Sequence, residues 1–178
     1  MLITGATGRI GRAIHALYPE ARASDRADGD LARDPPKIRA GEGTVIHLAG
    51  NLAENIDAAD LNIRMTINVL RACRQSSVRR LIIASSVLAD EPRAGFPITY
   101  YGAAKAAQEA MLSAWCAEDE SRIGVALRFG HFSPGSTPPL EHEAVRLDEG
   151  MLAHWVARAL ALENTGLTTW NAVGRVGK

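Results

Sequence analysis

The chain has 178 residues, of which 47% are hydrophobic and 22% charged, and its formal net charge at pH 7 is zero. This length suits one hydrophobic core, so we expect a single domain over residues 1–178, and the composition excludes a disordered or fibrous protein. The balanced charge argues against nucleic acid as a partner, and no stretch reaches the roughly 20 apolar residues that span a bilayer. We therefore expect a cytoplasmic protein without membrane contact. The separated Cys73 and Cys116 predict reduced thiols and no metal site.

Short apolar runs alternate with helical patterns along the chain, which predicts βαβ units and a parallel sheet. Strands are expected at 2–4, 21–24, 44–49, 80–84, 123–129 and 167–173. Helices are expected from the glycine-rich turn to Tyr18, then over 52–75, 99–117 and 148–163, with an irregular Pro/Gly-rich segment at 131–139. The order predicts a doubly wound α/β fold of the Rossmann type.

The segment TGATGRIG places Gly5, Gly8 and Gly11 directly after the first expected strand. Glycines here let the backbone approach a pyrophosphate, while the following helix N-terminus supplies free N–H groups. Gly11 also permits close packing of the helix on the strand. We therefore expect dinucleotide binding, and the alternative is a tight turn that serves only the fold.

Asp25 lies twenty residues after Gly5, at the end of the second expected strand. A carboxylate at this place accepts hydrogen bonds from the adenosine ribose of NAD. The alternative is an aspartate that caps a turn, since SDRADGD is rich in turn residues. Arg9 and Arg26 leave NADP open, because a guanidinium near that ribose would hold a 2′-phosphate.

In YGAAK, Tyr101 and Lys105 are four residues apart on an expected helix, so both side chains leave the same face. To act as a base near neutral pH, the tyrosine needs its pKa lowered by about three units, or roughly 4 kcal/mol. An ammonium about 4 to 6 Å away supplies roughly 3 to 4 kcal/mol at an effective dielectric near 20. The pattern is also common on helix surfaces, where Lys105 would be a solvated charge.

Ser85 and Ser86 follow the expected strand RLIIA at the carboxyl end of the sheet, where open α/β sheets bind ligands. A hydroxyl there can donate to a substrate oxygen, although Ser85 is more simply read as the start of a loop. His47 lies in an apolar strand and is expected to be a core histidine. His131 follows a strand end, where it is either exposed or lines a cavity.

Together, TGATGRIG, HLAG, IIASS, YGAAK and LRFG occur in the order found in the extended short-chain dehydrogenase/reductases. The chain resembles their NAD-dependent epimerase/dehydratase branch, and within it the uronate dehydrogenases. The resemblance implies that Ser86 polarises the substrate oxygen, Tyr101 exchanges the proton, and Lys105 holds the nicotinamide ribose and lowers the tyrosine pKa. It implies cofactor contacts from Gly5, Gly8, Arg9, Ile10, Gly11, Asp25, Asp30, Leu31, Leu48, Ala49, Gly50, Asn62 and Lys105.

The chain also departs from these families. Only four residues separate Asp25 from Asp30, so the second helix and third strand of the Rossmann pattern are expected to be reduced. Val87 and Leu88 stand where dehydratases place acidic residues and uronate dehydrogenases place polar ones, which counts against dehydration. Residues 131–178 are expected to supply a minimal substrate-side region that would hold a bulky nucleotide-sugar poorly.

The expected function is hydride transfer between NAD or NADP and a small sugar- or polyol-like hydroxyl or carbonyl compound. One alternative is a sugar epimerase of the same superfamily, and another is a non-catalytic, regulatory dinucleotide-binding protein. A homodimer is also expected. The alanine-rich face of the 99–117 helix either forms the subunit contact or faces the core, and it comprises Ala103, Ala106, Ala107 and Ala110 with Trp115.

Overall fold

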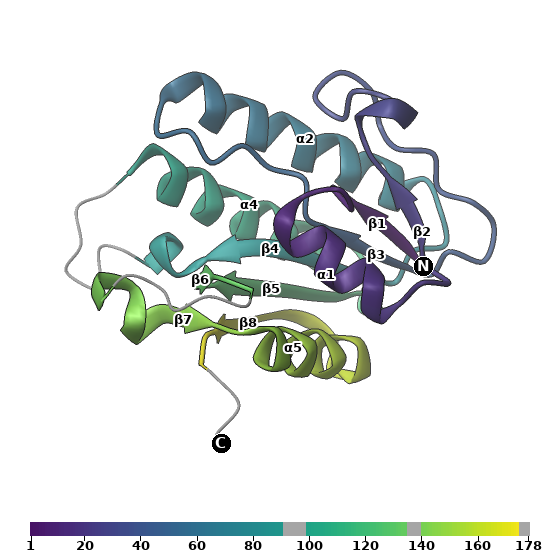
Figure 1. Ribbon diagram of the computed structural model, residues 1–178. Helices are drawn as coiled ribbons and strands as arrows, with labels where there is room; N and C mark the ends of the chain where they lie inside the picture. The colour runs from purple at the N-terminus through teal and green to yellow at the C-terminus, as the bar shows by residue number, and fades with distance from the viewer. Residues whose placement is uncertain (91–98, 135–139, 175–178) are drawn as a thin grey trace.

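The apolar runs form one parallel sheet in the computed structural model, which describes residues 1–90, 99–134 and 140–174. The strand order is β2-β1-β3-β4-β5-β8, and all neighbouring strands are parallel (Figure 1). The strands are β1 (Leu2–Thr4), β2 (Arg22–Ser24), β3 (Thr44–His47), β4 (Arg80–Ser86), β5 (Ile123–Phe129) and β8 (Gly166–Ala172). Because all strands are parallel, their carboxyl ends meet at one edge.

Helices cover both faces of this sheet. They are α1 (Arg9–Leu17), α2 (Ile56–Arg74), α4 (Tyr100–Ala117) and α5 (Glu149–Ala161). α2 and α4 pack side by side on one face, and α1 and α5 lie on the other (Figure 1). Shorter elements are η1 (Arg26–Asp28), η2 (Val87–Asp90), η3 (Leu140–Val145) and the strand pair β6 (His131–Phe132) and β7 (Arg146–Leu147).

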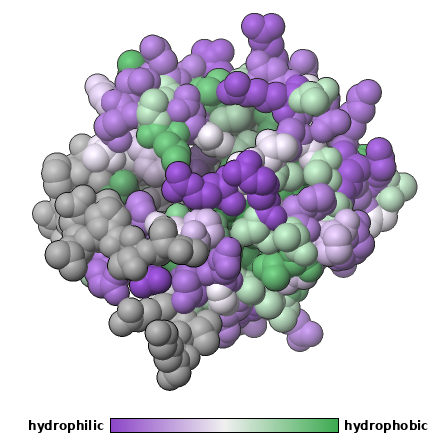
Figure 2. Space-filling model, in the orientation of Figure 1, coloured by the Kyte–Doolittle hydropathy of each residue, from purple (hydrophilic) through white to green (hydrophobic). Residues whose placement is uncertain are grey.

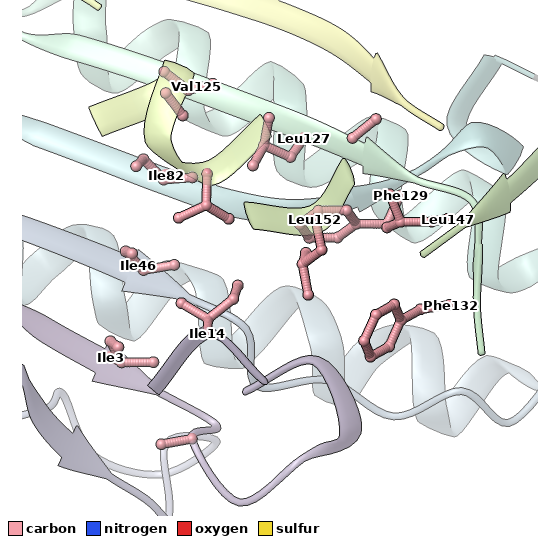
Figure 3. Close-up of a cluster of buried hydrophobic side chains, with 14 of the residues drawn as sticks. Ile3, Ile14, Ile46, Ile82, Val125, Leu127, Phe129, Phe132, Leu147 and Leu152 are labelled. Carbon is pink, nitrogen blue, oxygen red and sulfur yellow. The ribbon is translucent and has the colours of Figure 1, made fainter. Parts of the chain in front are cut away.

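Alternation along the strands divides the core into two clusters, because successive strand residues point to opposite faces. Ile3, Ile46 and Ile82 face α1 and α5, where they meet Ile14 and Leu152 (Figure 3). Their sequence neighbours face the opposite helices and form the second cluster, which includes Leu2, Val45, Leu81, Val69, Leu112 and Trp115. The sheet is therefore buried on both sides, as a parallel sheet requires.

The predicted Rossmann-type fold is confirmed, including its reduced part. Between β2 and β3, residues 25–43 contain no regular element except η1, so β2 forms an edge of the sheet. The chain leaves β1 for β2 on one side and returns to β3 on the other. The strand order thus reverses between β1 and β3, and α/β sheets bind ligands in the crevice at such a point.

Two expectations about the elements were wrong. The long helix begins at Ile56 and not at 52, because the Asn55 side chain caps it by accepting a hydrogen bond of 2.8 Å from the Ala58 backbone N–H. His131 and Phe132 are not irregular, since they pair with residues 146–147 as β6 and β7. Residues 133–134 are irregular as expected, and 135–139 lie outside the described residues. Trp115 is buried in the core, which is one of the two places that the sequence left open for it.

His47 is a buried residue whose two ring nitrogens both have partners, as expected for a core histidine. Its Nδ1 lies 2.8 Å from Thr4 Oγ1 and its Nε2 lies 3.2 Å from Thr66 Oγ1. Burial, assisted by the nearby Lys105 charge, lowers its pKa to about 3. The folded protein therefore holds this ring neutral.

No helix in the described part of the chain is long and apolar enough to cross a membrane.

The buried His47 predicts a pH-dependent stability. An unfolded histidine takes up a proton below its ordinary pKa of 6.5, whereas folded His47 does so only near 3. The stabilisation that neutral His47 gives to the folded protein is complete above pH 6.5. It is lost at up to about 1.4 kcal/mol per pH unit as the pH falls toward 3. In urea unfolding followed by circular dichroism, the stability difference between wild type and His47→Gln should shrink between pH 6.5 and 4.5. The exposed His154→Gln is the control, and a constant difference for His47→Gln would refute the prediction.

Candidate functional site

The glycine turn between β1 and α1 is built so closely that two of its positions exclude a side chain. Gly5 has a φ of +73°, and a Cβ added there would lie 2.5 Å from the Ala49 backbone nitrogen. A Cβ on Gly11 would lie 2.1 Å from the Gly5 carbonyl oxygen. Helix α1 therefore starts directly against the ends of β1 and β3, with its first N–H groups at the sheet crevice.

Two neighbouring cavities of about 480 Å³ each open along this crevice and share Gly5, Gly8, Leu48 and Gly50. The first is also lined by Arg9, Ile10, Gly11, Leu52, Ala84, Ser85, Ser86, Val87, Leu88, Tyr101, Lys105, Phe129, Gly130, His131, Phe132 and Val145. The second is also lined by Thr7, Asp25, Arg26, Ala27, Gly29, Asp30, Leu31, Ala49, Asn51, Leu61 and Met65. Two adjoining cavities beside a glycine turn fit the two halves of a dinucleotide.

In the second cavity, Asp25 is held within a turn, as one of its two readings predicted. Its carboxylate accepts a hydrogen bond of 3.0 Å from the Thr7 backbone N–H, and its own N–H donates to the Asp28 carboxylate at 2.9 Å. It thus braces the glycine turn and still lines the cavity. The Leu31 carbonyl accepts a bond of 2.9 Å from the buried Asn68 amide, which holds this loop over α2.

In the first cavity, the fold brings together Ser86 from the end of β4 and Tyr101 and Lys105 from the first turns of α4. The Lys105 ammonium lies 5.5 Å from the centroid of the Tyr101 ring and donates a bond of 2.6 Å to the Ala84 carbonyl. Only 3% of Lys105 is exposed, so it is not a solvated helix charge. Burial lowers its pKa to about 8, against the raising effect of Glu109.

The expected effect of Lys105 on the tyrosine is not seen. Burial raises the pKa of Tyr101 to about 12, the opposite of the lowering that the sequence argument required. The reason is geometric: the ammonium lies over the ring and bonds to the Ala84 carbonyl, while the phenol pays the full desolvation cost of ionising. A base at this position needs further positive charge or hydrogen bonds that appear only with bound ligands.

Asn62 lies directly behind Gly50, which lines both cavities, since a Cβ added to Gly50 would lie 3.6 Å from the Asn62 Oδ1. It is fully buried, and its amide exchanges two hydrogen bonds with the Asn51 backbone, at 2.7 Å to the N–H and 2.8 Å to the carbonyl. Gln108 of α4 donates in turn to the Asn62 carbonyl at 3.0 Å. Asn62 therefore shapes the segment after β3 and acts on the crevice through Gly50 and Asn51.

The sequence reasoning missed two carboxylates at α4. Glu54 accepts hydrogen bonds from the backbone N–H groups of Tyr100 and Tyr101 and so caps the first turn of the helix. Glu109 accepts hydrogen bonds from the Ser85 hydroxyl and the Arg128 guanidinium in the interior. A signal for Glu109 existed, because it is four residues after Lys105 on the same helix face. None marked Glu54, whose partners are 46 and 47 residues away.

The outer wall of the first cavity, beyond Ser86, is largely apolar among the described residues. Val87 and Leu88 of η2 are half-buried there, and Phe132 and Val145 line the same cavity. His131 also lines it and is half-buried. Because the Ser85 hydroxyl is bonded to Glu109, the cavity can present the Ser86 hydroxyl and the Tyr101 phenol to a reacting carbon. Figure 2 shows hydrophilic and hydrophobic residues intermixed over one face of the molecule.

Solved structures with this fold include several sugar-related enzymes. Uronate dehydrogenase from Agrobacterium tumefaciens has a TM-score of 0.76 at 19% identity, and the match covers 94% of this chain and 74% of that one. A UDP-galactose 4-epimerase has a TM-score of 0.70 at 19% identity, with 95% and 76% covered. A GDP-L-fucose synthetase from Naegleria fowleri bound to NADP has a TM-score of 0.66 at 16% identity, with 95% and 71% covered.

No curated protein sequence matches the chain significantly. The family description is more specific than the fold, because the NAD dependent epimerase/dehydratase family matches residues 1–174, which include the glycine turn, both cavities and α4. This match agrees with the two adjoining cavities and with the serine, tyrosine and lysine around one of them. The chain belongs to the NAD-dependent epimerase/dehydratase family.

Proposed function

We propose that the protein transfers a hydride between a nicotinamide cofactor and a small hydroxyl or carbonyl compound of the sugar or polyol kind. The observation that carries the proposal is the meeting of Ser86, Tyr101 and Lys105 at a cavity that adjoins the glycine turn. The glycine turn fits the pyrophosphate, since Gly5, Gly8 and Gly11 carry no side chains into the crevice and the first N–H groups of α1 lie there. When bound, the nicotinamide ring would exchange the hydride and, when oxidised, add positive charge near the phenol.

Each of the three side chains has a separate task in this proposal. The Ser86 hydroxyl, which accepts a bond of 3.2 Å from the Leu88 N–H, donates its own proton toward the substrate oxygen. Tyr101 gives or takes the proton of that oxygen. Lys105 binds the nicotinamide ribose from the wall beside Gly50, and its charge favours the phenolate.

The apolar residues after the serine support a redox reaction over dehydration. Elimination of water needs an acid or base beside the leaving hydroxyl, and Val87 and Leu88 supply neither. Two alternatives keep the same cofactor site. An epimerase would interconvert sugar stereoisomers without net NADH formation, and a regulatory protein would bind NADH and turn nothing over.

Replacing Tyr101 by Phe tests the proton step. In a screen of sugars, polyols and aldehydes followed by NADH absorbance, Tyr101→Phe should lose about 10² to 10⁴ in kcat while retaining NADH affinity. The matched control is Tyr100→Phe, since Tyr100 is the neighbouring residue and 53% exposed. Equal rates in wild type and Tyr101→Phe would remove the tyrosine from the mechanism. Tight NADH binding with no turnover, and no isomer exchange by NMR, would favour the regulatory alternative.

We propose NAD as the preferred cofactor, with NADP possible, because Asp25 places a carboxylate in the second cavity. A carboxylate accepts hydrogen bonds from the ribose hydroxyls of NAD and repels the 2′-phosphate of NADP. Arg26 lines the same cavity, and its guanidinium would attract that phosphate.

Fluorescence titration should therefore show tighter binding of NADH than of NADPH, by about tenfold or more. Asp25→Asn should narrow that ratio while its amide oxygen still accepts the Thr7 N–H. Asp34→Asn, on an exposed residue of the same loop, is the control. An unchanged ratio in Asp25→Asn would contradict the assignment.

We also propose a homodimer formed through the outer face of α4. Ala103 and Ala110 are exposed there, and Ala106 and Ala107 are half-buried, so a second helix can approach closely. Ala110→Glu should place a charge in the contact and convert the dimer to monomer in sedimentation equilibrium. Ala157→Glu, at an exposed position of α5 on the opposite face of the sheet, is the comparison, and a wild-type protein that sediments as a monomer would refute the proposal.

A further inference from the structure

Helix α4 is fastened to the carboxyl end of β4 by two polar contacts on adjacent strand residues. Lys105 donates a hydrogen bond of 2.6 Å to the Ala84 carbonyl. One helical turn later, Glu109 accepts a hydrogen bond of 2.5 Å from the Ser85 hydroxyl. Ser86 is the next strand residue. These two contacts therefore set the distance between the helix that carries Tyr101 and the serine at the sheet edge.

Glu109 is itself held by a residue of β5, the strand next to β4 in the sheet. The Arg128 guanidinium of β5 grips its carboxylate with two bonds, Nε to Oε1 at 2.9 Å and Nη2 to Oε2 at 2.8 Å. Arg128 Nη1 also lies 3.3 Å from the Asp90 carboxylate of η2. The paired geometry leaves the Glu109 carboxylate little freedom to rotate.

Charges alternate through the contacts from Asp90 to Arg128 and Glu109, and the Lys105 ammonium, one helical turn before Glu109, feels the Glu109 charge. Glu109 is only 8% exposed and Lys105 only 3%, so each charge would be costly without its neighbour. Two uncharged groups also face the ammonium, the Tyr101 phenol from α4 and the neutral His47 from β3. Among the described residues around the ammonium, Glu109 is thus the acidic group whose charge raises the Lys105 pKa against the effect of burial.

We propose that Glu109, oriented by Arg128, is a positioning residue of the active site: it locks α4 onto β4 beside Ser86 and holds Lys105 in its charged form. The inference rests on the proposed function for its catalytic consequence, but the charge balance is a property of the protein alone. Glu109 touches neither cavity, so it acts through Lys105 and Ser85.

The charge balance can be measured without turnover, because the chain contains only three lysines, Lys37, Lys105 and Lys178. With ¹³Cε-labelled lysine, Lys37→Arg and Lys178→Arg assign the NMR signals by elimination. The Lys105 signal should titrate near pH 8 in the wild type. Glu109→Gln should move its midpoint lower, since a buried ammonium loses its counter-charge. Arg128→Met should move the Lys105 midpoint higher, since the negative charge of Glu109 is then no longer neutralised by the Arg128 guanidinium.

Glu118→Gln is the matched control, because Glu118 follows the same helix and is paired with Arg122 at 2.9 Å far from the cavities. It should leave the Lys105 midpoint unchanged. Shifts of opposite sign in Glu109→Gln and Arg128→Met would not arise from loosened packing alone. A Lys105 midpoint equal to that of the wild type, in either variant, overturns the proposal. Folding of each variant is checked by near-ultraviolet circular dichroism, and one folded variant is enough for the test.

The catalytic consequence has its own readout. Glu109→Gln should lower kcat by about tenfold or more through misplacement of Tyr101 against Ser86, with the pH–rate profile displaced in the direction of the Lys105 midpoint. A wild-type kcat and profile in this variant overturn the positioning role. If the wild-type protein turns over no substrate, the proposed function fails, whereas the NMR titration still decides the charge balance.

Discussion

The interior position of one ammonium group determines how the candidate site is arranged. Lys105 enters the space between α4 and the sheet edge and is bonded there to a strand carbonyl. A charge in such surroundings needs partners, and the protein supplies them in sequence from α4, β5 and η2. The docking of the helix on β4 beside Ser86 follows from where this charge is buried, whereas the raised Tyr101 pKa follows from the burial of the phenol itself.

The glycine turn imposes the second constraint, and it is one of backbone geometry. Gly5 and Gly11 let α1 pack so close to β1 and β3 that neighbouring backbone fills the space where their side chains would be. Cavities therefore open on both sides of the turn, one toward the β2 edge with Asp25 and one toward α4. A fold with a missing third strand keeps this arrangement, because the lost strand would lie beyond β2, away from the crevice.

Local patterns in the sequence predicted much of this. The parallel sheet, its reduced edge, the helices that start near Thr99 and Asp148, and the members of the serine, tyrosine and lysine group follow from periodicity, turn residues and family resemblance. Such features depend on neighbours within a few residues, so a single sequence carries them. The assignment of His47 to the core was correct for the same reason, since an apolar strand surrounds it.

What the sequence determined by itself was the order of elements and the chemical types gathered at the sheet edge. Only the tertiary structure decided which polar groups meet: that Asn62 binds the Asn51 backbone, that Glu109 pairs with Arg128, and that the Tyr101 pKa rises. Hydrogen bonds and desolvation depend on distances of a few ångströms between segments far apart in the chain, and these distances are set only when helices and sheet pack.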